Sequence, residues 1–256
     1  MGPAIEARGL VRTFGDLVAV DHIDLTVPRG SFYGFLGPNG AGKSTTIKCL
    51  TGLLRPSGGE MRILDLDPLT EPVAVKRQVG VLPEELALFD RLSAAETLSF
   101  VGQVHGLAPA TIRERSTELL SLMELGGAGD TLVTDYSHGM RKKLSLAAAL
   151  LPAPRVLFLD EPFEGIDAVA SRQIRRLLLS FVQGGGTIFL TSHILEIVER
   201  LCDRIGVIHR GRIVAEGPLE ELRRGGVAGG RTLEELFLEL VGASAAEAPA
   251  LDWLGS

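Results

Sequence analysis

The chain has 256 residues, of which 45% are hydrophobic and 23% charged, and its formal net charge is -6 at pH 7. This length allows one large domain or two small ones around a buried core, and the composition argues against a disordered chain. The acidic balance disfavours a nucleic-acid-binding surface, and the two cysteines lack metal-ligand spacing and suit a reducing compartment.

Strands and helices are expected to alternate at the front of the chain and again after residue 152. Short apolar runs bounded by turn residues predict strands, and they lie at 5–14, 22–28, 31–37, 60–67, 79–83, 155–160 and 187–192. Residues 43–54 predict a helix that follows a Gly-rich turn, and residues 203–217 predict a hairpin. Parallel strands with intervening helices indicate an α/β core.

Between residues 84 and 152 the pattern becomes helical. Ser93 and Glu96 form a capping box that opens one helix. A second helix is indicated by apolar residues at helical spacing, namely Ile112, Leu119, Leu120 and Met123. This stretch is therefore expected to be a helical insertion in the α/β core.

The C-terminal part is expected to be a linker, a short helix and a loose tail. RRGGVAGGR at 223–231 predicts the linker, and a capping box of Thr232 and Glu235 opens an amphipathic helix over 232–241. We expect the apolar stripe of this helix to pack on its own domain rather than to enter lipid.

A Gly-rich loop lies between the expected strand at 31–37 and the helix at 43–54. Its sequence, GPNGAGKST, fits the phosphate-loop pattern G-x-x-x-x-G-K-[ST]. Inward-pointing backbone N–H groups and the helix N-terminus form an anion site, with Lys43 on the β- and γ-phosphates and the Ser44 hydroxyl on Mg²⁺. The candidate nucleotide-binding residues are Gly37, Pro38, Asn39, Gly40, Ala41, Gly42, Lys43, Ser44 and Thr45.

Two carboxylates end the strand expected at 155–160. Ligands bind at the carboxyl ends of strands in such sheets, so we expect Asp160 to hold Mg²⁺ and Glu161 to act as general base on the attacking water. His193 ends the next strand and is expected to reach the γ-phosphate and the water. Because an isolated acidic strand end is commonly only solvated and a lone histidine is usually structural, these roles depend on the nearby phosphate loop.

Together these motifs resemble the nucleotide-binding subunit of an ABC transporter over residues 4–241. The resemblance implies an α/β fold with a P-loop NTPase (RecA-like) parallel-sheet core, an N-terminal antiparallel β subdomain and an ABC-type helical insertion, and it implies ATP and Mg²⁺ as ligands. The domains expected from it are a core at 1–83 and 153–224, a helical subdomain at 84–152, and a linker, helix and tail at 225–256.

The sequence YSHGM, at 136–140, lies where the family carries a signature of Leu-Ser-Gly-Gly-Gln type. In the family, two subunits pack head to tail and each signature closes on the partner's phosphate loop. The Ser137 hydroxyl, the backbone around Gly139 and a helix N-terminus would form this second clamp on the γ-phosphate. An ordinary helix cap by Ser137 is compatible with this role, because the cap is the binding device. Two copies of this chain could form two competent sites, so a homodimer is the economical assembly. The residues this requires are all present, namely Lys43, Glu161, His193, Ser137 and Gly139.

Three further positions take roles from the resemblance. Phe14 is expected to stack on adenine, and Asp167 is the carboxylate of a loop, EGID, that crosses the dimer interface. Glu84 stands where the family usually has glutamine and is expected to sense Mg²⁺. His138 replaces a glycine and Met140 a glutamine. With LPEE and the late helix, these departures resemble bacterial subunits that serve separate ABC-2-type exporter permeases, including the Ecs-type group.

The chain has these motifs but no apolar run near the roughly 18 residues of a membrane span, and no N-terminal signal segment. The resemblance therefore implies a separate integral membrane permease, with the chain peripheral at the cytoplasmic face of the membrane. The helical insertion near residues 84–110 is expected to dock cytoplasmic helices of this permease. No nucleic-acid partner is expected, since RKK at 141–143 is predicted to be a solvated helix face.

Other functions remain open at this point. A soluble ABC ATPase of DNA repair or translation would carry a long coiled coil or two ATPase units, and the sequence has neither. An assembly scaffold or nucleotide switch would bind ATP but scarcely hydrolyse it, whereas Asp160, Glu161 and His193 favour hydrolysis. A small-molecule kinase leaves YSHGM and TSH unexplained. We therefore predict an ATP-hydrolysing transport subunit.

Overall fold

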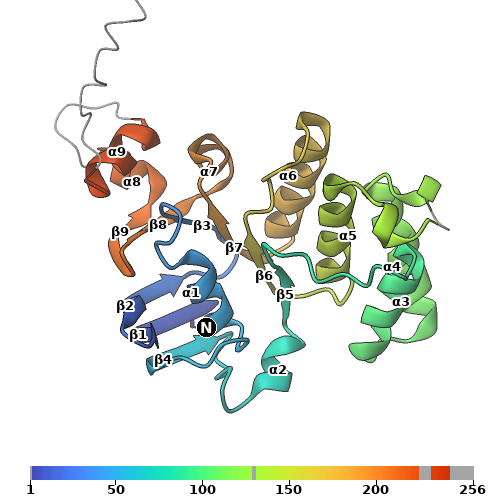
Figure 1. The fold of residues 1–256 in the computed structure, drawn as a ribbon, viewed down its shortest axis with the longest axis horizontal. Coiled ribbons are helices and arrows are strands. Elements are labelled where there is room, and N and C mark those ends of the chain that lie inside the picture. Colours follow the sequence, from blue (N-terminus) through green and yellow to red (C-terminus); the bar gives the residue numbers. More distant parts are fainter. Residues whose placement is uncertain (1, 129–130, 225–231, 243–256) are drawn as a thin grey trace, which may run out of the picture.

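The computed structural model describes residues 2–128, 131–224 and 232–242 (Figure 1). Its strands form a three-stranded antiparallel sheet in the order β2-β1-β4 and a six-stranded sheet in the order β5-β6-β7-β3-β8-β9. In the larger sheet every neighbouring pair is parallel except β8 and β9. The strands are β1 (Ile5–Phe14), β2 (Leu17–Val27), β3 (Phe32–Leu36), β4 (Gly58–Ile63), β5 (Val79–Leu82), β6 (Val156–Asp160), β7 (Thr187–Ser192), β8 (Arg204–His209) and β9 (Arg212–Pro218).

The helices gather into groups on the two sides of this larger sheet (Figure 1). They are α1 (Lys43–Leu50), α2 (Pro72–Lys76), α3 (Ala94–Val104), α4 (Pro109–Leu122), α5 (His138–Leu150), α6 (Ala168–Gln183), α7 (Leu195–Leu201), α8 (Leu219–Arg224) and α9 (Leu233–Leu240), with 3₁₀ turns at Gly126–Ala128 and Val133–Asp135. No helix in the described ranges combines the length and the apolar character that a membrane crossing needs.

The six-stranded sheet separates two hydrophobic clusters. On β3, Phe32 and Leu36 join the cluster that holds the buried residues of α5, α6 and α7. Tyr33 and Phe35 join the other cluster, with the three-stranded sheet and α1. Successive side chains of a strand point to opposite faces, so the sheet is buried on both sides. This arrangement explains why its strands are continuous apolar runs rather than alternating ones.

Helices α3, α4 and α5 pack together on the side of the molecule away from the three-stranded sheet (Figure 1). The predicted capping box of α3 is confirmed, because Ser93 Oγ accepts from Glu96 N (3.2 Å) and Glu96 Oε2 accepts from Ser93 N (2.8 Å). The predicted second helix is confirmed as α4, in which Ile112 is buried. Leu98 of α3 and Leu157 of β6 belong to the same hydrophobic cluster, so the helical segment and the sheet share a core. The division into domains at residue 84 remains a prediction.

Several element boundaries differ from those expected. The strand predicted at 60–67 ends at Ile63, because Leu64 and Asp65 take positive φ values of 52° and 72° and turn the chain. The strand predicted from residue 22 begins at Leu17, and the helix predicted to reach residue 54 ends at Leu50. The hairpin of β8 and β9 is confirmed.

At the C-terminus, the predicted helix with its Thr232–Glu235 capping box is confirmed as α9. Leu233 is fully buried and its N–H donates to Glu199 Oε1 of α7 (3.2 Å), so α9 packs on its own domain as expected. The linker was predicted to begin at residue 223, which is too early. Residues 223–224 are the last two of the short helix α8, which directly follows β9. The rest of the linker and the tail from 243 on lie outside the described residues.

Candidate active site

The phosphate loop joins β3 to α1 and has a backbone that requires its glycines. Gly40 and Gly42 have φ values of 78° and 110°, in the region that favours glycine. Space is also restricted, because a Cβ on Gly42 would lie 2.4 Å from the carbonyl oxygen of Ala19. A Cβ on Gly37 would lie 2.5 Å from the carbonyl oxygen of Ile208. The loop is thus a tight cradle, and its last glycine, Gly42, is the N-cap of α1.

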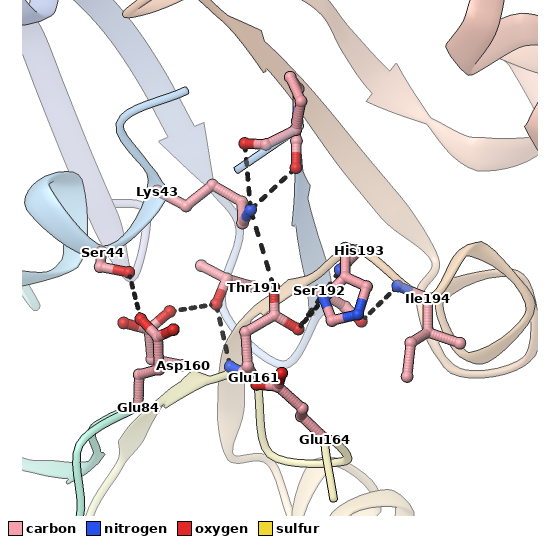
Figure 2. Close-up of polar contacts among 12 residues, drawn as sticks. Lys43, Ser44, Glu84, Asp160, Glu161, Glu164, Thr191, Ser192, His193 and Ile194 are labelled. Carbon is pink, nitrogen blue, oxygen red and sulfur yellow. Dashed lines mark hydrogen bonds and ion pairs between the residues drawn. The ribbon is translucent and has the colours of Figure 1, made fainter. Parts of the chain in front are cut away.

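Lys43 is buried at the start of α1, and its ammonium group lies inside this cradle. Its Nζ donates to the carbonyl oxygens of Gly37 (2.8 Å) and Pro38 (3.4 Å) and lies 3.7 Å from Glu161 Oε1 (Figure 2). Ala41 closes the loop by donating its N–H to Pro38 O (3.1 Å). The lysine is therefore held by carbonyl oxygens that phosphate oxygens can replace.

The acidic pair lies beside the loop, because β6 and β7 run parallel to β3 and end at the same edge of the sheet. Asp160 ends β6 and accepts a hydrogen bond from Thr191 Oγ1 (2.5 Å). Glu161 follows with a φ of 49°, and its N–H donates to Thr191 Oγ1 (3.1 Å). A positive φ at a non-glycine residue is strained and persists where surrounding contacts hold it.

Glu161 is only 5% exposed. One of its two carboxylate oxygens accepts a hydrogen bond from a described residue and the other does not. Its Oε2 lies 3.0 Å from His193 Nδ1 and accepts from the His193 backbone N–H over 3.3 Å (Figure 2). Its Oε1 accepts no hydrogen bond from any described residue, and its closest cation is Lys43. An unpartnered buried carboxylate oxygen is costly unless a ligand completes it. It is a suitable acceptor for a proton of water.

The residues expected to hold Mg²⁺ supply the right kind of atoms. Ser44 Oγ donates to Glu84 Oε2 over 3.2 Å, and the Asp160 carboxylate lies at the neighbouring strand end (Figure 2). All three side chains offer oxygen, which hard cations such as Mg²⁺ prefer, and Mg²⁺ commonly completes its shell with waters and substrate phosphates. No cluster of three or more His, Cys, Asp or Glu side chains that could hold a metal occurs in the described residues. The donors therefore fit an ion bound together with a phosphate.

A cleft of about 430 Å³ contains most of the predicted site. The predicted residues that line it are Phe14, Asn39, Gly40, Gly42, Lys43, Ser44, Thr45, Glu84, Glu161 and His193. Phe14 is 45% exposed at the edge of the cleft, and the guanidinium carbon of Arg12 lies 4.4 Å from its ring centroid. A cation at this distance leaves the opposite face of the ring for another planar group.

Seven predicted residues are not among those that line this cleft. Four of them lie in the phosphate loop or at the adjoining strand end, namely Gly37, Pro38, Ala41 and Asp160. The other three lie at the N-termini of other helices. Ser137 caps α5, and its Oγ accepts from the Met140 N–H (3.2 Å). Gly139 lies in the first turn of the same helix. Asp167 caps α6 by accepting from the N–H groups of Val169 and Ala170, both at 2.9 Å. The bond from Ala170 above all lowers the pKa of the Asp167 carboxyl. Within one chain, the phosphate loop and the signature are separate.

The prediction of a solvated basic face at 141–143 is wrong for Lys142. This residue is 2% exposed, and its Nζ donates to the carbonyl oxygens of Glu161 and Glu164, each at 2.6 Å. Arg141 is ion-paired with Asp90 (2.9 Å). The residues after β6 fold back over α5 and cover Lys142, which a one-dimensional charge pattern does not reveal.

Comparison with known proteins agrees with this geometry. A family model described as ABC transporter matches residues 20–164. The chain is 43% identical over 220 residues to the daunorubicin/doxorubicin resistance ATP-binding protein DrrA of Streptomyces peucetius, covering 86% of this chain and 67% of that protein. It is 40% identical over 223 residues to the Nod factor export ATP-binding protein I of Cupriavidus metallidurans, covering 87% and 73%.

A solved structure described as an ATP binding subunit of an ABC transporter has the same fold. It superposes with a TM-score of 0.88 at 32% identity, covering 93% of this chain and 99% of that one. The alternative of a scaffold or nucleotide switch finds no support in these comparisons. The chain therefore belongs to the ABC transporter family, as an ATP-binding subunit that hydrolyses ATP to power transport.

Proposed function

We propose that two copies of this chain close on two ATP molecules and drive export through a separate membrane permease of ABC-2 type. The observation that carries the proposal is the separation of Ser137, at the tip of α5, from the cleft that holds Lys43 and Glu161. One copy has both halves of a nucleotide clamp but does not join them. A head-to-tail dimer joins each half with its complement.

Within each cleft, we assign binding to the phosphate loop and to Phe14, which stacks on adenine. Ser44, Asp160 and Glu84 would hold Mg²⁺, and the ion would supply positive charge to neutralise the phosphate oxygens. Together with Lys43, the loop N–H groups draw the β- and γ-phosphates into the cradle.

Hydrolysis is assigned to Glu161. Its open Oε1 accepts a proton as a water oxygen attacks the γ-phosphorus and the bond to the ADP oxygen breaks. His193 holds Oε2, so that the carboxylate keeps one orientation. Ser137 and Gly139 of the second copy bring a helix N-terminus to the γ-phosphate, and Asp167 lies at the dimer interface.

The permease is proposed to dock beside the helical segment. A cavity of about 400 Å³ is bordered by Leu53, Val81, Phe89 and Val101, among others, where the sheet meets α3 and α5. Phe89 is 52% exposed and stacks edge-on against Phe100 with 5.0 Å between ring centroids. An open apolar cavity of this kind suits a short helix of the permease. The named relatives in drug resistance and Nod factor export support the exporter direction.

Docking at this cavity would hold the chain at the cytoplasmic face of the membrane. Fractionation of the native cells tests this, and we expect the wild-type chain to sediment with membranes and Phe89→Asp to release it. Val214→Asp, on exposed β9, is the matched control. A wild-type chain found only in the soluble fraction would contradict the permease proposal.

Mixing of inactive variants tests the head-to-tail dimer. Lys43→Ala damages a phosphate loop and Ser137→Arg damages a signature, so each homodimer should be inactive. In a mixed dimer, both lesions fall in one composite site and the other site is intact. ATP hydrolysis should therefore return on mixing.

The control mixture combines Lys43→Ala with Glu161→Gln. These lesions lie in the same half of the site, so each site of the mixed dimer keeps one lesion and activity should stay absent. Pull-down with two different tags would establish that mixed dimers form. Mixed dimers of the first pair without activity would refute the composite site.

A further inference from the structure

Lys142 is buried on α5 although it lies in a run of three basic residues. Its Nζ makes two hydrogen bonds of 2.6 Å, to the carbonyl oxygens of Glu161 and Glu164, which follow 19 and 22 residues later in the chain. Charged lysines are seldom fully buried unless they are paired. Since the bonds go to main-chain oxygens, the lysine restrains the course of the backbone at the strand end.

The backbone that Lys142 holds is the strained one. Glu161 has a φ of 49°, and its N–H is fixed by the Thr191 hydroxyl at 3.1 Å. Lys142 fixes the carbonyl on the other side of the same residue. With both peptide groups held, the side chain leaves the backbone in one direction, toward His193 and Lys43. Strain of this kind is maintained by contacts that over-determine it.

Two further contacts attach the same segment to the first turn of α5. A Cβ on Gly165 would lie 2.9 Å from His138 Cδ2, so the imidazole rests directly on that glycine. A Cβ on Gly139 would lie 3.8 Å from Ile166 Cγ2. His138 and Lys142 are four residues apart and thus lie on one helix face. The segment 161–166 is therefore seated along the end of α5 that begins at the signature.

Lys142 also places a positive charge close to the carboxylates of the site. Burial lowers the pKa of its ammonium group, while Glu164, Glu161, Glu84 and Asp160 raise it. Glu84, Glu161 and Glu164 line the cleft, where a triphosphate would bring further negative charge. A neutral residue here would remove both the backbone restraint and this compensating charge.

We propose that Lys142 is a positioning residue that ties the general base Glu161 to α5. A displacement of the α5 N-terminus is then transmitted to Glu161 of the same chain. In the proposed dimer that N-terminus grips the ATP of the other site, so nucleotide at one site sets the geometry of the base at the other. This inference depends on the proposed dimer and on the proposed role of Glu161.

The test compares Lys142→Gln and Lys142→Arg with the wild type in steady-state ATP hydrolysis. Glutamine is too short to reach both carbonyl oxygens, and a loss of about 10²-fold in kcat is expected, since a misplacement near 1 Å can have this effect. The KM for ATP should stay unchanged and the Hill coefficient should fall toward one. Arginine keeps a cation with several N–H donors and should recover most of the kcat. Lys48→Gln, an exposed lysine of α1, is the matched control and should behave as wild type.

Three results would overturn the inference: a wild-type kcat in Lys142→Gln, an equal loss in both variants together with weaker ATP binding, or a lower kcat with an unchanged Hill coefficient. Glu161→Gln is measured alongside. If it keeps wild-type turnover, the proposed function itself has failed. If it loses turnover while Lys142→Gln does not, only the role of Lys142 is rejected.

Discussion

The imidazole Nδ1 of His193 lies 3.0 Å from Oε2 of Glu161, which connects the ends of the neighbouring parallel strands β6 and β7. The His193 N–H adds a second contact to the same oxygen at 3.3 Å. The other oxygen, Oε1, is buried and accepts no hydrogen bond from the described residues. This asymmetry orients the carboxylate and leaves one oxygen for water.

Replacing Glu161 with glutamine removes the proton acceptor and keeps the shape of the side chain. We expect turnover to fall by roughly 10²–10⁴-fold, the range typical of a general base. ATP binding should persist, because the phosphate loop is untouched, and a long-lived ATP-bound dimer should accumulate. Steady-state hydrolysis and size-exclusion chromatography with ATP measure the two effects.

Glu196→Gln is the control for this variant, since Glu196 is an exposed residue of α7 that pairs with Arg200. It should leave turnover near the wild-type value. Wild-type turnover in Glu161→Gln would reject Glu161 as the base.

The phosphate loop and the strand ends could be predicted because their signals are local. Lys43 and the flanking glycines occupy fixed spacings between a strand and a helix, and Glu161 directly follows an apolar run. Parallel strands then bring such ends to one edge of the sheet. For this reason residues as distant as Phe14 and His193 meet in the same cleft.

The contacts of Lys142 could not be predicted in this way, because they depend on how residues 161–164 cross α5. The positive φ of Glu161 has no local signal either, since glycine or asparagine is the usual sign of that conformation. One signal was available. Lys142 shares a helix face with Ser145 and Ala149, which are small and buried, so helical periodicity indicates a covered face there.

Replacing Glu84 with alanine tests the proposed Mg²⁺ site. Its Oε2 accepts from Ser44 Oγ over 3.2 Å, so both groups can approach one cation. Glu84→Ala should raise the Mg²⁺ concentration needed for half-maximal hydrolysis, because one oxygen donor and one negative charge are lost. Titration of ATPase activity with Mg²⁺ at saturating ATP measures this. Glu85→Ala, at the exposed neighbouring position, should not change the titration. An identical curve for Glu84→Ala would exclude it from the site.

Replacing Phe14 with alanine or tyrosine tests the proposed contact with adenine. One face of its ring is covered by Arg12, whose guanidinium carbon lies 4.4 Å from the centroid. Phe14→Ala should raise the KM for ATP about tenfold with little change in kcat, since a stacking contact is worth about 1–3 kcal/mol per base and is made in ground and transition states alike. Phe14→Tyr keeps the ring and should retain the wild-type KM. Equal KM values for all three proteins would show that adenine stacks elsewhere.

Asp167 gives a prediction for the pH dependence of stability. Its carboxylate accepts two hydrogen bonds from the N-terminus of α6, and these lower its pKa from the usual 3.8. The unfolded chain therefore binds the proton more readily, and the free energy of unfolding rises with pH through this range. The stabilisation is complete above the unfolded pKa and is lost as the pH falls through the lower folded pKa.

Asp167→Ala should accordingly be less stable than wild type at pH 7, and the difference should shrink as the pH falls below 3.8, the usual value for this group. Urea unfolding at several pH values gives the measurement. Asp167→Asn keeps an oxygen that can cap α6, so it should retain more stability than the alanine variant at pH 7. A difference between wild type and Asp167→Ala that stays constant or grows in acid would contradict the capping role of the charged carboxylate.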